Sequence, residues 1–170
     1  MAFSFFGLLF IYFPLIKVYF FPPQPLLPPH TKFSIAIPKI NALAPVVENV
    51  DPWSRDTYQL ALEKGVAHAK GTALPGEHKT IYLFAHSSDD PWKITRYNTV
   101  FLKLGLLDLE DEIVLTKEGI AYTYRVREKK TVPPSSVEYL MNLATDQLIL
   151  QTCTPPGTDW QRLLVFADPV

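Results

Sequence analysis

The sequence is poor in cysteine and glycine, with one cysteine, Cys153, and seven glycines among 170 residues. One thiol excludes a disulfide within the chain and leaves too few sulfur ligands for a structural zinc site. The small number of glycines also argues against loops that cradle phosphate groups through their backbone amides. A lone cysteine is usually a small buried side chain, but it can also be a reactive thiol, and composition alone does not decide between the two.

Neither sign of charge is in clear excess, because the formal net charge is −1 at pH 7. This balance excludes the basic surface typical of nucleic-acid-binding domains, so we expect no nucleic acid partner. Hydrophobic residues make up 48% of the chain and charged residues 19%, which is too apolar for a disordered protein. The composition therefore predicts a packed core.

The N-terminus is a long apolar run. Residues 1–16 carry no charged side chain, and the run continues past Lys17 to residue 21. A stretch of this length spans about 30 Å of hydrocarbon as a helix, and a lysine near its end reaches the headgroups. A cleaved signal peptide is disfavoured because a positive start and a small-residue cleavage site are missing. We expect residues 1–21 to be a single-pass anchor in the cell membrane, with the folded domain on the extracytoplasmic side.

A proline-rich linker is predicted at residues 22–31. Five of the nine residues from 22 to 30 are proline, and such a stretch adopts an extended polyproline conformation. The linker separates the anchor from a folded domain at residues 32–170.

The folded domain is predicted to be mainly β. Short apolar or alternating runs bounded by proline and glycine indicate strands near residues 33–37, 42–47, 80–86, 113–115, 122–126, 148–152 and 163–167. Short helices are predicted at residues 51–65, 98–107 and 135–140. Seven or eight short strands of this kind are typical of a closed or nearly closed barrel.

Three reactive side chains stand at predicted strand ends. Cys153 follows the run at residues 148–152, His86 ends the strand at 80–86, and Arg162 opens the run at 163–167. A thiol, an imidazole and a guanidinium are the groups that a thiol-based acyl transfer requires. Each has a common structural alternative, namely a buried thiol, a histidine with one hydrogen bond and an arginine in a surface ion pair. Papain-like proteases are disfavoured because their cysteine precedes the histidine.

The other three histidines are assigned no chemistry. We interpret His68 and His78 as loop or surface residues, and His30 belongs to the linker.

Several motifs occur in an order and spacing that resemble one family. They are Ile-Pro-Lys-Ile at 37–40, Gly-Thr-Ala-Leu-Pro-Gly at 71–76, Ala-His at 85–86, Leu-Ile-Leu-Gln-Thr-Cys at 148–153 and Arg-Leu-Leu-Val at 162–165. Together they resemble the sortases, which are cell-surface cysteine transpeptidases. The sequence departs from the family pattern at Ala85, where many members have glycine, and at residues 87–92, where many have an Arg-rich or aromatic continuation.

The resemblance implies an activity and a role for each site residue. Cys153 would attack the scissile Thr carbonyl of a Leu-Pro-x-Thr-Gly-like sorting signal and form a thioester. His86 would transfer protons, Arg162 would hold the substrate carbonyl or the oxyanion, and Ala85 and Thr152 would contribute to substrate binding. The implied partners are surface proteins with a C-terminal sorting signal and an amine acceptor, either a cell-wall precursor or a pilin lysine.

No cofactor is expected, although calcium activation stays open. Some relatives use a carboxylate-rich loop for calcium, and acidic clusters occur at Asp89–Asp90 and at Glu110–Glu112. Solvated loop charge is the favoured interpretation of both clusters. Two alternatives to the transpeptidase also remain: a non-catalytic, membrane-tethered β-barrel that binds peptides, and a hydrolase that uses water as acceptor.

Overall fold

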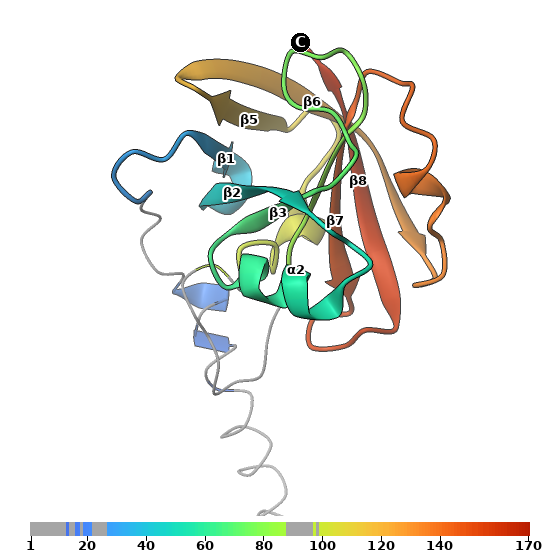
Figure 1. The fold of residues 1–170 in the computed structure, drawn as a ribbon. Helices are drawn as coiled ribbons and strands as arrows, with labels where there is room; N and C mark the ends of the chain where they lie inside the picture. Colours follow the sequence, from blue (N-terminus) through green and yellow to red (C-terminus); the bar gives the residue numbers. More distant parts are fainter. Residues whose placement is uncertain (1–12, 14–15, 18, 22–26, 88–96, 98) are drawn as a thin grey trace, which may run out of the picture.

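The computed structural model describes residues 13, 16–17, 19–21, 27–87, 97 and 99–170 of the chain (Figure 1). Its strands are β1 (Phe33–Ile37), β2 (Ala42–Val50), β3 (Val66–Ala69), β4 (Ile81–Phe84), β5 (Glu112–Lys117), β6 (Ile120–Val132), β7 (Leu148–Thr154) and β8 (Gln161–Pro169). Its helices are α2 (Arg55–Leu62) and the 3-10 turns η1 (Pro38–Ile40), η2 (Leu104–Leu106) and η3 (Glu138–Leu140).

The strands close into a barrel in the order β1-β2-β3-β4-β7-β8-β6-β5. Two neighbouring pairs, β2–β3 and β4–β7, are parallel, and the others are antiparallel. A parallel pair needs a crossover connection, and α2 lies within the one that joins β2 to β3. The prediction of a mainly β, closed barrel is confirmed.

The two faces of the β4, β7 and β8 strands have different surroundings. Leu83, Leu150 and Val165 are directly paired across these strands and are buried in the barrel interior. Their neighbours in sequence point outward, because side chains alternate along a strand. We call this second side, which carries Tyr82, Phe84, Gln151 and Cys153 among others, the outer face.

Two aromatic contacts cover the flanks of the outer face. The ring of Tyr58 in α2 lies 6.2 Å from that of Phe84, and the ring of Tyr139 in η3 lies 5.6 Å from that of Phe166. Both contacts are edge-on, which is a favourable geometry for aromatic pairs. On the outer face, α2 therefore lies beside Phe84 of β4, and η3 lies beside Phe166 of β8.

The predicted helix at 51–65 is shorter in the structure. It begins at Arg55 with Ser54 as its N-cap residue, while the Asp51 carboxylate accepts a hydrogen bond from the Trp53 amide at 2.9 Å. Gly65 lies beyond the helix end, where a Cβ atom would come 2.1 Å from the Pro45 carbonyl oxygen. The connection can therefore pass this close to β2 only with glycine at position 65.

The predicted helix at 98–107 is also different. Its described residues form turns and the short η2, with Phe101 and Leu104 buried in the core. These two apolar residues are buried, but they belong to a loop that packs against the core. The prediction of a helix was therefore wrong.

Most of the predicted anchor lies outside the described residues, as does part of the linker. Among the residues that the structure does describe, no helix is both long and apolar enough to cross a membrane. The anchor at residues 1–21 and the linker at 22–31 therefore stay predictions.

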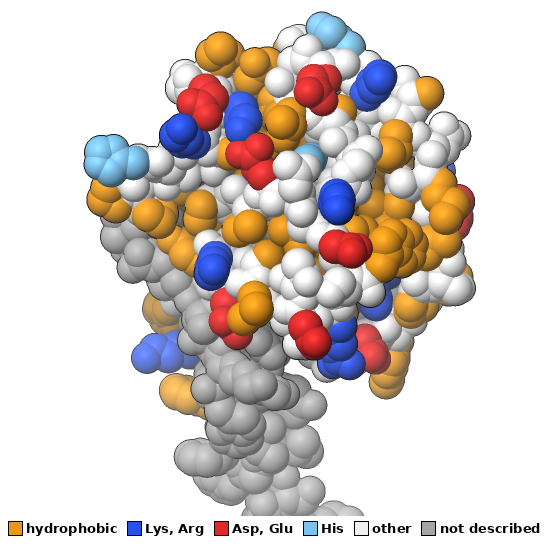
Figure 2. Space-filling view, in the orientation of Figure 1, with side chains coloured by type: hydrophobic (Ala, Val, Ile, Leu, Met, Phe, Trp, Pro, Cys, Tyr) orange, Lys and Arg blue, Asp and Glu red, His pale blue; other side chains and the backbone are white. Residues whose placement is uncertain are grey.

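Charged side chains of both signs are interspersed on the visible surface. Figure 2 shows lysine and arginine beside aspartate and glutamate on this face of the barrel, with no extended basic patch among them. This distribution agrees with the near-neutral net charge.

His68 is buried in β3, so its interpretation as a loop or surface residue was wrong. Its Nδ1 accepts a hydrogen bond from the Asn49 amide at 3.3 Å, which leaves the proton on Nε2. Nε2 then donates to the Ala73 carbonyl at 3.0 Å, and the Thr72 hydroxyl lies at the same distance. Burial lowers the pKa of His68, so the ring is neutral and joins β2 to the Gly-Thr-x-x-Pro-Gly loop.

We predict that His68 makes the fold less stable in mild acid. Its folded pKa lies below the unfolded value of about 6.5, so the unfolded chain takes up this proton at a higher pH than the folded chain does. The free energy of unfolding should therefore decrease from pH 7 to pH 5, by at most about 1.4 kcal/mol per pH unit from this residue. Urea unfolding of the wild type and of His68→Gln measures the difference.

His30→Gln, which changes an exposed residue of the predicted linker, is the control variant and should keep the wild-type pH dependence. Equal pH dependence in His68→Gln and the wild type would contradict this role of His68.

Candidate active site

Strand pairing brings the three predicted site residues to neighbouring strand ends. Cys153 in β7 is the direct cross-strand partner of Arg162 in β8. On the other side of β7, the parallel ladder pairs Phe84 with Gln151, and the Ala85 amide donates to the Gln151 carbonyl at 3.1 Å. His86 follows two residues after Phe84, as Cys153 follows Gln151. The backbone register therefore sets His86 level with Cys153.

A side-chain hydrogen bond fixes β4 and β7 together beside the thiol. The Thr152 hydroxyl donates to the Ala85 carbonyl at 2.9 Å, and both side chains are buried. The bond continues the connection between the two strands just past the last paired residues. Because these side chains are buried, a substrate contact by Ala85 or Thr152 would have to use main-chain groups, and their substrate-binding role stays a prediction.

Cys153 is only partly exposed, and its surroundings favour the neutral thiol. Burial raises the pKa of Cys153, the Arg162 guanidinium counteracts part of that rise, and the Asp159 carboxylate adds to it. The Arg162 guanidinium therefore favours the thiolate. Desolvation is nevertheless the larger effect.

Arg162 is held by main-chain carbonyls rather than by a carboxylate. Its Nη1 donates to the Asp159 carbonyl at 3.0 Å and to the Gln161 carbonyl at 3.3 Å. In the described part of the chain it forms no ion pair. No carboxylate among the described residues pairs directly with this guanidinium, which lies close enough to Cys153 to affect the pKa of the thiol.

His86 is half-buried and lies two residues beyond the end of β4. The segment that follows it, including most of residues 87–92 where the sequence departs from the family pattern, lies outside the described residues. The position of His86 relative to Cys153 thus rests on the strand register.

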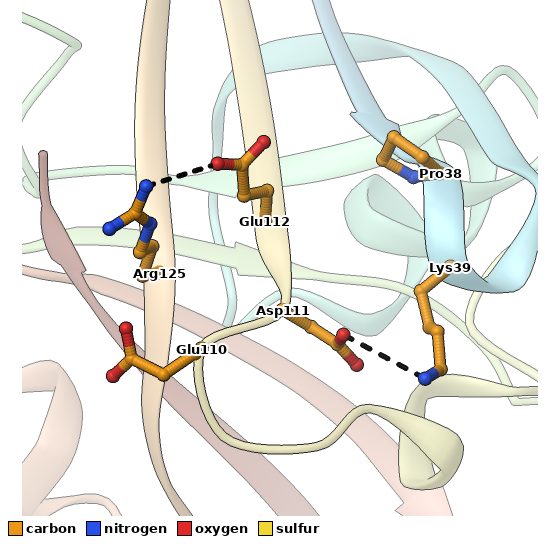
Figure 3. Close-up of a pocket in the computed structure, with 6 residues that line it drawn as sticks. All are labelled: Pro38, Lys39, Glu110, Asp111, Glu112 and Arg125. Atoms are coloured by element: carbon orange, nitrogen blue, oxygen red, sulfur yellow. Dashed lines mark hydrogen bonds and ion pairs between the residues drawn. The ribbon is translucent and has the colours of Figure 1, made fainter.

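The acidic cluster at Glu110–Glu112 lines a surface pocket together with Pro38, Lys39 and Arg125 (Figure 3). Its carboxylates point in different directions, since Glu112 pairs with Arg125 at 3.3 Å and Asp111 faces Lys39 at 3.9 Å. Among the described residues, no three His, Cys, Asp or Glu side chains are grouped to hold a metal ion. Asp89 and Asp90 lie outside those residues, and calcium activation stays untested.

Two residues that the sequence did not single out lie on the same face as the thiol. The buried Tyr82 hydroxyl donates to the Gln151 side-chain oxygen at 2.6 Å, and Gln151 precedes Cys153 by two positions on the same face. Strand alternation could have placed both residues on the outer face. It could not have shown that they bond to one another.

Comparisons with known proteins agree on one family. The Sortase domain family matches residues 35–170. Sortase D of Bacillus subtilis (strain 168) is 32% identical over 140 residues, which cover 80% of this chain and 62% of that protein. The chain therefore spans less than two thirds of the length of this curated relative.

Solved structures agree with this match. Sortase C-1 from Actinomyces oris superposes with a TM-score of 0.68 at 28% identity, covering 81% of this chain and 73% of the other. Sortase A from Corynebacterium diphtheriae gives a TM-score of 0.67 at 31% identity, covering 82% and 60% respectively.

We predict that two charged neighbours of Cys153 change its alkylation rate in opposite directions. Arg162→Met should slow labelling by iodoacetamide at neutral pH, because it removes the charge that lowers the pKa of the thiol. Asp159→Asn should speed labelling, because it removes the charge that raises that pKa. Changes of about two- to tenfold are expected, since one pKa unit is tenfold in thiolate population. Mass spectrometry of quenched time points measures the rates.

Arg125→Met is the matched control, because it removes the same charge from β6 at the pocket of Figure 3. Equal labelling rates in all four proteins would contradict the electrostatic account of Cys153.

Proposed function

The chain is a member of the sortase family, and from this we propose that it is a cysteine transpeptidase that cuts a sorting signal and transfers the acyl group to an amine. The observation that supports the proposal most directly is the pairing of Cys153 with Arg162 across β7 and β8, with the His86 strand end on the other side of β7. A nucleophile, an oxyanion partner and a proton carrier thus come from three adjacent strands.

The first step is attack by sulfur on the scissile carbonyl. Because the resting thiol of Cys153 is favoured in its neutral form, we infer that His86 accepts its proton as the Sγ–C bond forms. The tetrahedral intermediate carries a negative oxygen, which the Arg162 guanidinium stabilises. His86 then gives the proton to the departing amine, the C–N bond breaks, and a thioester remains on Cys153.

The second step runs in the reverse sense. An incoming amine attacks the thioester carbonyl and loses a proton to His86, a new amide bond forms, and the sulfur leaves and recovers the proton. In the free protein the Asp159 and Gln161 carbonyls hold Arg162. In both steps the guanidinium gives up these two hydrogen bonds and donates to the substrate oxygen instead. The same imidazole, that of His86, therefore accepts and returns one proton in each step.

The setting of the reaction follows from the resemblance. We propose that the donor is a surface protein with a Leu-Pro-x-Thr-Gly-like signal and that the acceptor amine comes from a cell-wall precursor or a pilin lysine. Residues 1–21 would anchor the chain, and residues 22–31 would hold the catalytic domain outside the membrane. Product analysis with and without an added amine separates transfer from hydrolysis by water.

A second candidate, a membrane-tethered barrel that binds peptides without catalysis, is favoured by one observation. The thiol of Cys153 is partly buried, and its pKa is raised rather than lowered. A thiol that resists alkylation in the folded protein and forms no acyl adduct would favour this candidate.

We predict that Cys153→Ala abolishes the acyl adduct and the transfer. The wild type, mixed with a sorting peptide, should gain the mass of the acyl fragment, and hydroxylamine should remove it because a thioester is cleaved by that nucleophile. His86→Ala and Arg162→Met should lower kcat/KM by about a hundredfold or more. Intact-protein mass spectrometry follows the adduct, and liquid chromatography follows the products.

Circular dichroism controls for folding of the three variants. The proposal is refuted if Cys153→Ala, correctly folded, still cleaves sorting peptides.

A further inference from the structure

Gln151 is a polar side chain in an apolar part of the outer face. Its direct partners on the neighbouring strands are Phe84 in β4 and Leu164 in β8, both of which are buried. Directly paired residues project from the same side of a sheet, so the Gln151 amide lies between these two apolar side chains. Cys153 stands two residues further along β7 on the same face, about 7 Å away.

Tyr82 fixes the orientation of that amide. Its hydroxyl donates to the Gln151 Oε1 atom at 2.6 Å, and the whole side chain is only 1% exposed. Burial raises the pKa of Tyr82 well above its usual range, so the phenol is a neutral hydrogen-bond donor throughout the physiological pH range. Because Oε1 is held on the Tyr82 side, the Nε2 group is turned the other way.

The Nε2 group has two N–H donors that nothing in the described part of the chain accepts. Gln151 is partly exposed, unlike its two apolar partners, so this amide can be reached from outside. A bound peptide that covers it would remove it from water. Burying an N–H group in that way without an acceptor costs binding free energy, whereas burying one that finds an acceptor on the peptide does not.

We propose that Gln151 is a specificity-determining residue, which donates a hydrogen bond from Nε2 to an acceptor on the donor peptide, and that Tyr82 is its positioning residue. This inference rests on the proposed function. A peptide extended along β7 advances about 3.3 Å per residue, so the acceptor lies about two residues from the carbonyl that Cys153 attacks. A donor peptide without an acceptor at that point is discriminated against.

The acceptor has two sources with the same chemistry: a main-chain carbonyl or a side-chain oxygen. One set of donor peptides replaces successive amide links by ester links, which weakens one carbonyl acceptor at a time. A second set carries either asparagine or leucine at each position in turn, so that the two peptides of a pair differ in having or lacking a side-chain oxygen. We expect one substitution, about two residues from the scissile carbonyl, to lower kcat/KM for the wild type but not for Gln151→Met.

The central variants are Gln151→Met, Tyr82→Phe and the double variant. Methionine keeps the length of the side chain and removes the amide, so kcat/KM for the donor peptide should fall about tenfold or more. We expect the loss mainly in KM, with the pH profile of kcat/KM unchanged. Tyr82→Phe frees the amide and should give a smaller loss. The double variant should match Gln151→Met, because Tyr82 acts only through Gln151.

Leu164→Met is the matched control, since it changes the other neighbour of Gln151 on the same face without removing a hydrogen bond. Its kcat/KM should stay within about twofold of the wild type, as expected for a volume-conserving exchange. The iodoacetamide labelling rate of Cys153 should be equal in all these proteins. Slower or faster labelling of Gln151→Met would show a general disturbance of the site and would overturn the inference.

Failure of this inference is distinct from failure of the proposed function. If the wild type forms a thioester and Gln151→Met matches it in kcat/KM and in peptide preference, Gln151 has no such role, although the chain remains a transpeptidase. Additive losses in Tyr82→Phe and Gln151→Met would also overturn the assigned roles. If the wild type forms no Cys153 adduct with any peptide, the proposed function fails first.

Discussion

The pairing of β7 with β4 on one side and β8 on the other is the constraint on which the site depends. His86 follows β4, Arg162 lies in β8, and β7 itself carries the Cys153 thiol. No loop has to be held in place for Cys153 and Arg162 to stay adjacent, since both sit within a hydrogen-bonded ladder. The bond from the Thr152 hydroxyl to the Ala85 carbonyl extends the same rigidity to the residue before His86.

The chemical state of the thiol reflects a competition between burial and one positive charge. Burial raises the pKa of Cys153. Arg162 opposes that rise from the neighbouring strand but is itself engaged with two carbonyls in the free protein. The balance of these effects favours the neutral thiol in the free protein.

Much of the barrel, and the strand ends that carry the candidate site residues, could be predicted from the sequence, because strand boundaries carry strong local signals. Pro38 ends β1, and apolar runs lead directly to Cys153 and from Arg162. The strand at Val66–Ala69 was missed, since four residues around a histidine have no clear pattern, and His68 was therefore misplaced. The bond between Tyr82 and Gln151 joins residues 69 positions apart and depends on side-chain geometry, which no local pattern encodes.

The parallel pairing of β4 with β7 has a consequence for the order in which this protein is made. His86 is synthesised well before Cys153, because β5 and β6 are inserted between the two paired strands. The barrel closes only when β8, the last strand, joins β7 to β6, and that same strand delivers Arg162. Closure of the barrel and the arrival of Arg162 beside Cys153 therefore both await the synthesis of β8, so a chain released before that strand has neither.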